Sequence, residues 1–150
     1  MDLFICWANV GRSQTAEWFA KRKWKKVISC ASVEARKEKY NFHPEKDVTE
    51  IMLENYNIKI SNQDIFYPSD ILKYFDKIEN IYFLFNPKDV KKEVDKELLI
   101  NNIPIWDYLK KIWKKYKIHS IKDPDWESRE SIEKIVEEIR ILVNGIYKIT

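Results

Sequence analysis

The residues with the clearest chemical potential lie near the start of the chain, where five residues separate Cys6 from Arg12 and Ser13 follows directly. An apolar run precedes Cys6 and a helix-compatible stretch follows Ser13, so the intervening chain can curl around one centre. The loop amides and the positive end of the helix would then point inward, and the guanidinium would bind two oxygens at once. This pattern predicts a cradle for a phosphate-sized dianion, lined by Trp7, Ala8, Asn9, Val10 and Gly11.

The same electric field favours a thiolate over a thiol, so Cys6 is expected to be nucleophilic at neutral pH. Ser13 can donate its hydroxyl to the sulfur and ease the later departure of the sulfur. Asn9 suits the middle of the loop because asparagine tolerates left-handed torsions and bonds to nearby backbone. Gly11 is one of only two glycines and falls where the backbone must turn tightly. A buried cysteine at a chance distance from an arginine is the plainer interpretation, but the flanking elements, serine and glycine together favour an anion site.

A second reactive group lies far downstream, in the only Asp-Pro pair of the chain, Asp123-Pro124. Cleavage of a phosphate ester needs a proton for the departing oxygen, and a carboxylic acid above the cradle can supply it and then deprotonate water. Taken alone, Asp123 is as readily interpreted as the start of a turn or a helix cap. Its assignment as a general acid therefore depends on the Cys6 loop.

These motifs, in this order, resemble the low-molecular-weight protein tyrosine phosphatase family over nearly the full chain. The matching residues are the Cys6 to Ser13 loop, Ala16-Glu17, 27–32, His43-Pro44, 47–56, 58–61 and Asp123-Pro124. The resemblance implies that Cys6 is the nucleophile, Arg12 the phosphate and transition-state ligand, and Asp123 the general acid. It also implies that Asn9 and Ser13 support the loop.

Several positions depart from the family pattern. Ala8 stands where many members have glycine, and Gly11 replaces a second loop cysteine that some members use as a redox guard. Cys30 occupies a position that the family usually fills with serine, so a bond between Cys6 and Cys30 on oxidation is conceivable. The aromatic pair that usually follows Asp-Pro is reduced to one tryptophan, so the expected walls for an aryl substrate are Trp126 and Trp7.

The loop also resembles that of thioredoxin-coupled arsenate reductases, which share the fold. Those enzymes carry a pair of resolving cysteines well downstream of the loop, whereas this chain has no cysteine after Cys30. Hydrolysis of a phosphomonoester, on phosphotyrosine or aryl phosphates through a cysteinyl-phosphate intermediate, is therefore the preferred prediction. Arsenate reduction and a non-catalytic phosphate-binding module are the alternatives, the latter because of Ala8 and the shortened aromatic wall.

Short apolar runs predict buried parallel strands at about 2–6, 27–32, 78–85 and 102–106. Helical patterns are expected at about 13–25, 45–56, 69–75, 87–98 and 127–147. This alternation predicts an α/β fold with its ligand at the carboxyl ends of the strands. With the resemblance, the expected architecture is a three-layer open sandwich, phosphatase-I-like, with a central four-stranded parallel sheet and helices on both faces.

Composition agrees with a single domain over residues 1–150, since 45% hydrophobic content in a chain of this length can form a substantial core. Two cysteines make no disulfide framework, and the N-terminus lacks the pattern of a signal peptide, so the cytoplasm is the expected location. No segment approaches the roughly 20 apolar residues of a membrane span. No cofactor and no metal are expected, because His43 and His119 have no further metal-ligand residues near them in the sequence.

Basic residues form two clusters, at 21–26 and 110–117, each interleaved with aromatic residues. Nucleic acid is the less favoured interpretation, because the net charge is only +3 and acidic residues are plentiful. The clusters can instead steer an acidic phosphoprotein toward the cleft. The expected partners are a phosphorylated protein or a small aryl phosphate as substrate, and inorganic phosphate or vanadate as ligand.

Overall fold

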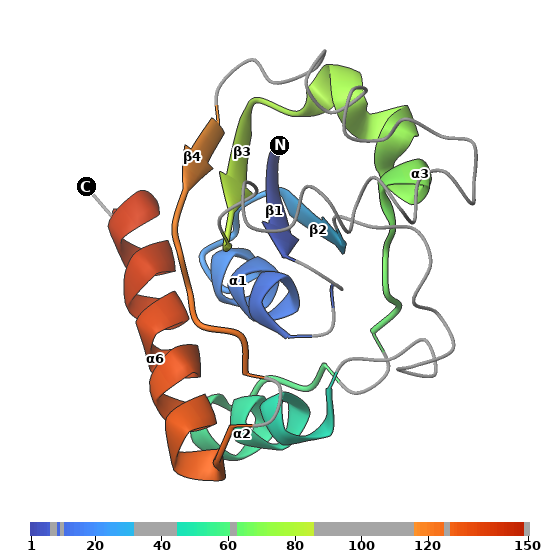
Figure 1. Ribbon diagram of the computed structural model, residues 1–150. Helices are drawn as coiled ribbons and strands as arrows, with labels where there is room; N and C mark the ends of the chain where they lie inside the picture. Colours follow the sequence, from blue (N-terminus) through green and yellow to red (C-terminus); the bar gives the residue numbers. More distant parts are fainter. Residues whose placement is uncertain are drawn as a thin grey trace.

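The computed structural model describes residues 1–6, 9, 11–31, 45–60, 63–85, 116–124 and 127–148. Its strands are β1 (Asp2–Cys6), β2 (Val27–Ala31), β3 (Asn80–Phe83) and β4 (Tyr116–Ile118). They form one parallel sheet in the order β2-β1-β3-β4 (Figure 1). Because β1 is central, its carboxyl end, at Cys6, lies where ligands bind in open α/β sheets.

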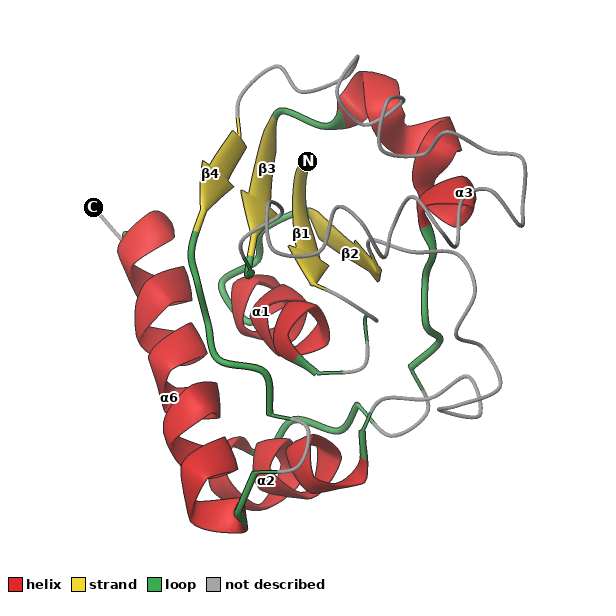
Figure 2. Cartoon of the chain, viewed as in Figure 1, coloured by secondary structure: helices red, strands yellow, loops and turns green. Residues whose placement is uncertain are grey.

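The described helices are α1 (Arg12–Lys21), α2 (Lys46–Tyr56), α3 (Pro68–Ile71), the 3-10 helix η1 (Leu72–Lys77) and α6 (Arg129–Ile146). α1 and α6 pack against each other on one face of the sheet, and α2 packs against α6 (Figure 2). α3 and η1 lie on the other face (Figure 1). The expected three-layer α/β architecture with a four-stranded parallel sheet is therefore confirmed.

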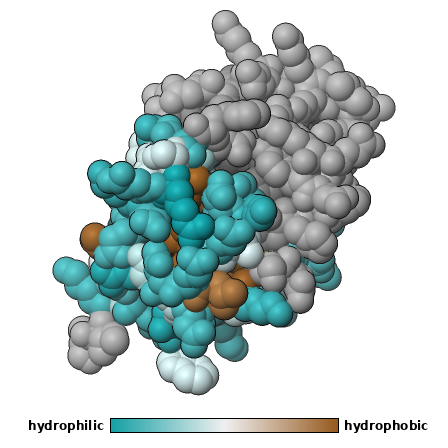
Figure 3. All heavy atoms as spheres, turned by 90° about the horizontal axis from the view of Figure 1, so that it is seen from below, coloured by the Kyte–Doolittle hydropathy of each residue, from teal (hydrophilic) through white to brown (hydrophobic). Residues whose placement is uncertain are grey.

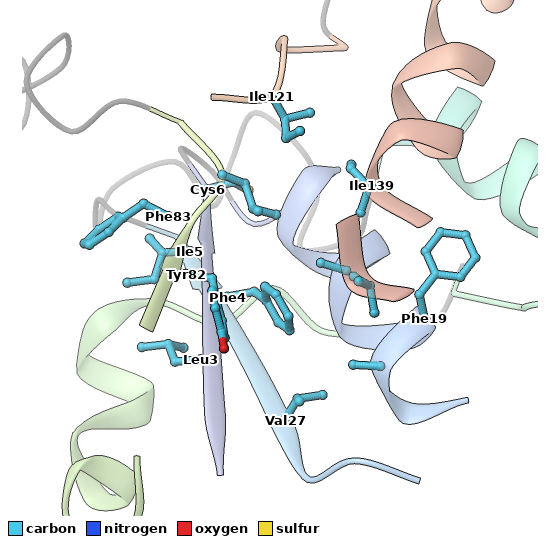
Figure 4. Packing of buried hydrophobic residues seen from close by; sticks show 14 of the residues in the cluster. Leu3, Phe4, Ile5, Cys6, Phe19, Val27, Tyr82, Phe83, Ile121 and Ile139 are labelled. Atoms are coloured by element: carbon cyan, nitrogen blue, oxygen red, sulfur yellow. The ribbon is translucent and has the colours of Figure 1, made fainter. Parts of the chain in front are cut away.

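The position of β1 inside the sheet explains why its sequence is an uninterrupted apolar run. Leu3, Phe4 and Ile5 are all fully buried, because helices cover both faces of the sheet. Phe4 points toward α1 and α6 and stacks on Tyr82 with ring centroids 5.2 Å apart, whereas Leu3 and Ile5 point toward η1 (Figure 4).

The first three predicted strands are confirmed, and the predicted fourth strand, 102–106, lies outside the described residues, as does the helix expected at 87–98. Among the described residues, the fourth strand of the sheet is β4, which sequence reasoning missed because it is three residues long and exposed. The helix expected at 69–75 is a single α-helical turn followed by a 3-10 helix. The helix expected at 13–25 ends earlier, at Lys21, because Trp24 adopts a left-handed backbone conformation.

The described surface is mostly hydrophilic when seen from below, with hydrophobic residues in small separate areas (Figure 3). Within the described part of the chain, no helix combines the length and the apolar character needed to cross a membrane.

A polar cluster joins α2 to α6. The Tyr56 hydroxyl donates to Glu137 Oε2 at 2.5 Å, and Arg140 pairs with the same carboxylate. The hydrogen bonds from Arg140 and then from Tyr56 lower the pKa of Glu137 to about 2. Burial, followed by the bond to Glu137, raises the pKa of Tyr56 to about 12. The phenol therefore stays a donor and the carboxylate an acceptor across the neutral range.

Replacement of Glu137 by glutamine is expected to remove a pH-dependent part of the stability. A carboxylate whose pKa is lowered by folding stabilises the folded protein at pH values above the pKa that the same group has in the unfolded chain. This contribution is lost as the pH falls toward about 2. Glu137→Gln should therefore lower the free energy of unfolding at neutral pH, and by less as the pH falls. Urea unfolding at several pH values, with Glu130→Gln as the exposed control, measures this difference. If the free energies of unfolding of wild type and Glu137→Gln changed with pH in parallel, this expectation would be contradicted.

Candidate active site

The candidate nucleophile lies at the junction of β1 and the loop that leads into α1. Cys6 is the last residue of β1, with only 2% of its surface exposed. Its Sγ lies 2.9 Å from the hydroxyl of Ser13, in the first turn of α1. The structure thus brings the predicted cysteine and serine into hydrogen-bond contact.

Asn9 holds the loop from its centre. It is fully buried and adopts the left-handed conformation, with φ 58°. Its Nδ2 donates to the hydroxyls of Ser13, at 2.7 Å, and Ser29, at 2.8 Å. Its Oδ1 accepts from the backbone amide of Phe66, at 2.9 Å, and from Gln14 Nε2, at 3.1 Å. The side chain therefore connects the loop to β2, to α1 and to the segment before α3.

The hydrogen bonds continue from Asn9 to a buried carboxylate. The hydroxyl of Ser29 donates to Glu17 Oε1 at 2.8 Å, and Glu17, 2% exposed, pairs with Lys21 Nζ at 2.9 Å. A buried charge is tolerated when it is paired and hydrogen-bonded in this way. Sequence reasoning did not identify Ser29 as part of the site, although a serine inside a buried apolar strand is a usable signal.

The start of α1 is built differently from the starts of α2 and α6. Glu45 caps α2 by accepting from the amides of Asp47 and Val48, and Ser128 caps α6. The N-cap of α1 is Gly11, which has no side chain to accept such bonds. The first amides of α1 and the positive end of its dipole are therefore suited to an external anion.

Arg12 is buried at the edge of this loop, with 7% of its surface exposed. Its NH1 donates to the backbone carbonyls of Ile121, at 2.9 Å, and Leu84, at 3.3 Å. These two bonds fix the plane of the guanidinium and leave Nε and NH2 as the remaining donors, the pair that can bind two oxygens of one phosphate. NH2 lies 3.8 Å from Asp123 Oδ2.

Pro124 fixes where Asp123 lies relative to the loop. Pro124 is buried, and a Cβ atom added to Gly11 would lie 3.2 Å from its Cγ. Gly11 itself has φ −142° and ψ −88°, so it is not left-handed. A glycine here leaves room for the proline, and among the described loop residues it is Asn9 that adopts the left-handed torsion. Asp123 is left about half exposed above the site.

The remaining predicted lining residues, Trp7, Ala8, Val10 and Trp126, lie outside the described residues. His119 follows β4, and burial lowers the pKa of its imidazole. Three residues are expected to do chemistry. Cys6 and Arg12 come from one loop, and Asp123, more than 100 residues away in the sequence, joins them at the carboxyl end of the sheet.

The bond between Cys6 and Cys30 that the sequence suggested does not fit this geometry. Cys6 is in register with Ala31, and Cys30 is in register with Ile5. Partners in register point to the same face of a parallel sheet and successive residues alternate. Cys6 therefore points toward α1 and Cys30 toward the opposite face, and both thiols are buried. Their bonding would require the strand ends to rearrange.

Removal of the Asn9 side chain is expected to lower the stability markedly. Asn9→Gly keeps the left-handed torsion accessible but leaves the Phe66 amide and its other buried partners without their bonds, which should lower the free energy of unfolding by about 2–4 kcal/mol. Asn9→Ala should lower it by about 1 kcal/mol more, because alanine disfavours this torsion. Urea unfolding compares the two variants, and a loss below about 1 kcal/mol in Asn9→Gly would contradict the central role of this side chain.

The chain resembles known proteins in structure and not in sequence. No family model matches the sequence, and no curated protein sequence matches it. Solved structures match over nearly the whole chain. A low-molecular-weight protein tyrosine phosphatase from T. tengcongensis superposes with a TM-score of 0.66 at 18% identity, covering 96% of this chain and 95% of that one. Vibrio vulnificus Wzb, in complex with benzylphosphonate, gives 0.67 at 16% identity, covering 96% and 94%.

Arsenate reductases match equally well. The enzyme from Archaeoglobus fulgidus superposes with a TM-score of 0.66 at 16% identity, covering 97% of this chain and 98% of that one. The chain therefore has the fold that low-molecular-weight protein tyrosine phosphatases and these arsenate reductases share.

Proposed function

We propose that the protein is a cysteine-dependent phosphomonoester hydrolase that acts on phosphotyrosine or aryl phosphates. The observation that carries the proposal is the position of Cys6 Sγ, 2.9 Å from the Ser13 hydroxyl at the start of α1. Arg12 and Asp123 lie at the same end of the sheet, with their side chains 3.8 Å apart. The complex of Vibrio vulnificus Wzb with benzylphosphonate supports an aryl-bearing phosphate as the ligand class.

In the first step, the Cys6 thiolate attacks the phosphorus in line with the leaving oxygen. The sulfur–phosphorus bond forms, the bond to the phenolic oxygen breaks, and Asp123 donates its proton to the departing phenolate. Arg12 and the first amides of α1 stabilise the charge on the non-reacting oxygens. The product is a cysteinyl phosphate and a free phenol.

In the second step, Asp123, now a carboxylate, takes a proton from water as the water oxygen attacks the phosphorus. The sulfur–phosphorus bond breaks, and inorganic phosphate leaves. Ser13 stabilises the departing thiolate by donating its hydroxyl to the sulfur, for which its 2.9 Å contact is suited. The enzyme returns to its starting protonation state.

Arsenate reduction is the second candidate, because arsenate reductases share the fold. An arsenylated Cys6 would need a second thiol to resolve it. The chain has only one other cysteine, and Cys30 faces the opposite side of the sheet. A reductase of this kind would therefore depend on an external thiol.

The test is hydrolysis of an aryl phosphate in the presence of a chelator, alongside arsenate reduction with a thiol donor. Wild type is expected to release phosphate, and Cys6→Ser to release none while still binding vanadate. Cys30→Ser is the matched control, since it makes the same chemical change on the other face of β1 and β2 and should retain the activity. Thiol-dependent arsenite formation without hydrolysis would move the protein to the reductases. Vanadate binding with neither activity would favour a binding module.

A further inference from the structure

A wide groove lies beside the C-terminal end of α1. The described residues that line it come from the ends of α1 and α2, from the turn that follows α1, and from α6 and the residues after it; α1 and α2 both pack against α6 (Figure 1). The groove has a volume of about 1040 Å³. α1 has 10 residues, so its two ends are about 15 Å apart. The groove is therefore separate from the site at the start of that helix.

The described lining of the groove is strongly basic. It holds five cations and one carboxylate, a net charge of +4 against +3 for the whole chain, contributed by Arg22, Lys23, Lys25, Arg140, Lys148 and Glu137. The carboxylate is already engaged by Arg140 and Tyr56. Among the described residues, no carboxylate forms an ion pair with the three lysines. The groove is therefore suited to a ligand with several negative charges.

Trp24 stands at the edge of this groove in an unusual conformation. It is 94% exposed and left-handed, with φ 61°. The amide of Trp24 donates to the carbonyl of Lys21 at 2.9 Å, and that of Lys25 donates to Ala20 at 3.2 Å. These bonds form a Schellman motif, in which the left-handed position is usually glycine. A tryptophan here incurs conformational strain and gains almost no packing, which points to a use for the exposed ring.

We propose that this groove binds single-stranded nucleic acid, with a base stacked on Trp24 and backbone phosphates at Lys23, Lys25 and Lys148. Aromatic side chains set among lysines and arginines bind single strands in this way, with little sequence preference. The groove, at about 1040 Å³, is at the upper limit of small-ligand pockets. Its cations come from separate elements, which favours the several phosphates of a short strand over the single phosphate of a free nucleotide. Composition made nucleic acid the less favoured partner because the net charge is summed over the whole chain, whereas folding adds Arg140 and Lys148 to the basic cluster at 21–26.

The experiment measures binding of a fluorescent RNA oligonucleotide without terminal phosphates, so that the Cys6 loop is offered no phosphomonoester. Trp24→Gly removes the ring and relaxes the left-handed turn, so it should keep or raise Tm while weakening binding about tenfold. Lys23→Ala/Lys25→Ala should reduce the slope of log affinity against log salt by about 1.4. Lys59→Ala/Lys134→Ala, which removes two exposed lysines outside the groove, is the matched control and should change neither quantity.

Weakening by Trp24→Gly and by the groove lysines, with the control unchanged, would support the proposal. Equally tight binding of cyclic AMP, a mononucleotide without a phosphomonoester, would overturn it in favour of a free nucleotide. Equal affinities of wild type and Trp24→Gly would overturn it in favour of general attraction to polyanions. Absence of binding at physiological salt would also overturn it. None of these outcomes depends on whether Cys6 hydrolyses aryl phosphates.

Discussion

Arg12→Lys is expected to lower kcat/KM for an aryl phosphate by about 10³-fold. Loss of a single donor to a developing oxyanion lowers the rate by about 10²–10³-fold, and this substitution removes a bidentate contact. Lysine offers a compact charge without the planar fork that binds two oxygens at once. It also leaves the carbonyls of Leu84 and Ile121 without the NH1 donor that joins the end of β3 to the Asp123 segment.

Steady-state kinetics with vanadate inhibition measures this effect. Vanadate should bind much more weakly to Arg12→Lys, because the guanidinium contacts the anion in both the ground state and the transition state. Arg22→Lys is the matched control, since Arg22 is exposed at the other end of α1 and bonds to the carbonyl of Tyr56. An Arg12→Lys enzyme with nearly wild-type activity would exclude the guanidinium as a transition-state ligand.

Asp123→Asn is expected to lower kcat by about 10²–10⁴-fold when the leaving group is a weakly acidic phenol. Asparagine keeps the shape of the side chain near Arg12 but has no proton to give to a departing phenolate. A nitrophenol leaves without protonation, so the loss in the first step should shrink along a series of more acidic phenols. Because Asp123 is about half exposed, the fold should be little affected.

The leaving-group series contains its own control. A plot of log kcat/KM, which reports the first step, against the pKa of the phenol should be steep for Asp123→Asn and shallow for wild type. Equal slopes would contradict the role of Asp123 as general acid, even if the variant were slower. Thermal unfolding of both proteins shows whether any loss of activity comes from instability.

The local part of the candidate site was accessible from the sequence. Cys6 and Ser13 lie seven residues apart, and the strand before them and the helix after them are short-range features that apolar runs indicate well. Asn9 was placed in a left-handed loop position because few residue types tolerate it, and its φ of 58° agrees. Gly11 was noticed for its rarity, but its contact with Pro124 depends on a segment more than 100 residues away.

The parts that escaped prediction depend on tertiary contacts. Ser29 is a small polar residue in an apolar strand, and only the fold shows that it joins Asn9 to Glu17. β4 is short and exposed, so its sequence contains no apolar run that would indicate a strand. The end of α1 was placed too late because the surrounding residues favour helix, whereas Trp24 ends it with a torsion that sequence statistics assign to glycine.

The most direct test of the central claim is to trap the covalent intermediate. Wild type and variants are mixed with an aryl phosphate bearing a good leaving group, quenched in acid, digested and analysed by mass spectrometry. We expect one added phosphoryl group on the peptide that contains Cys6, more of it in Asp123→Asn, the same in Cys30→Ser and none in Cys6→Ser. Steady hydrolysis by wild type with no phosphoryl group on Cys6, or a phosphorylated peptide elsewhere, would contradict it.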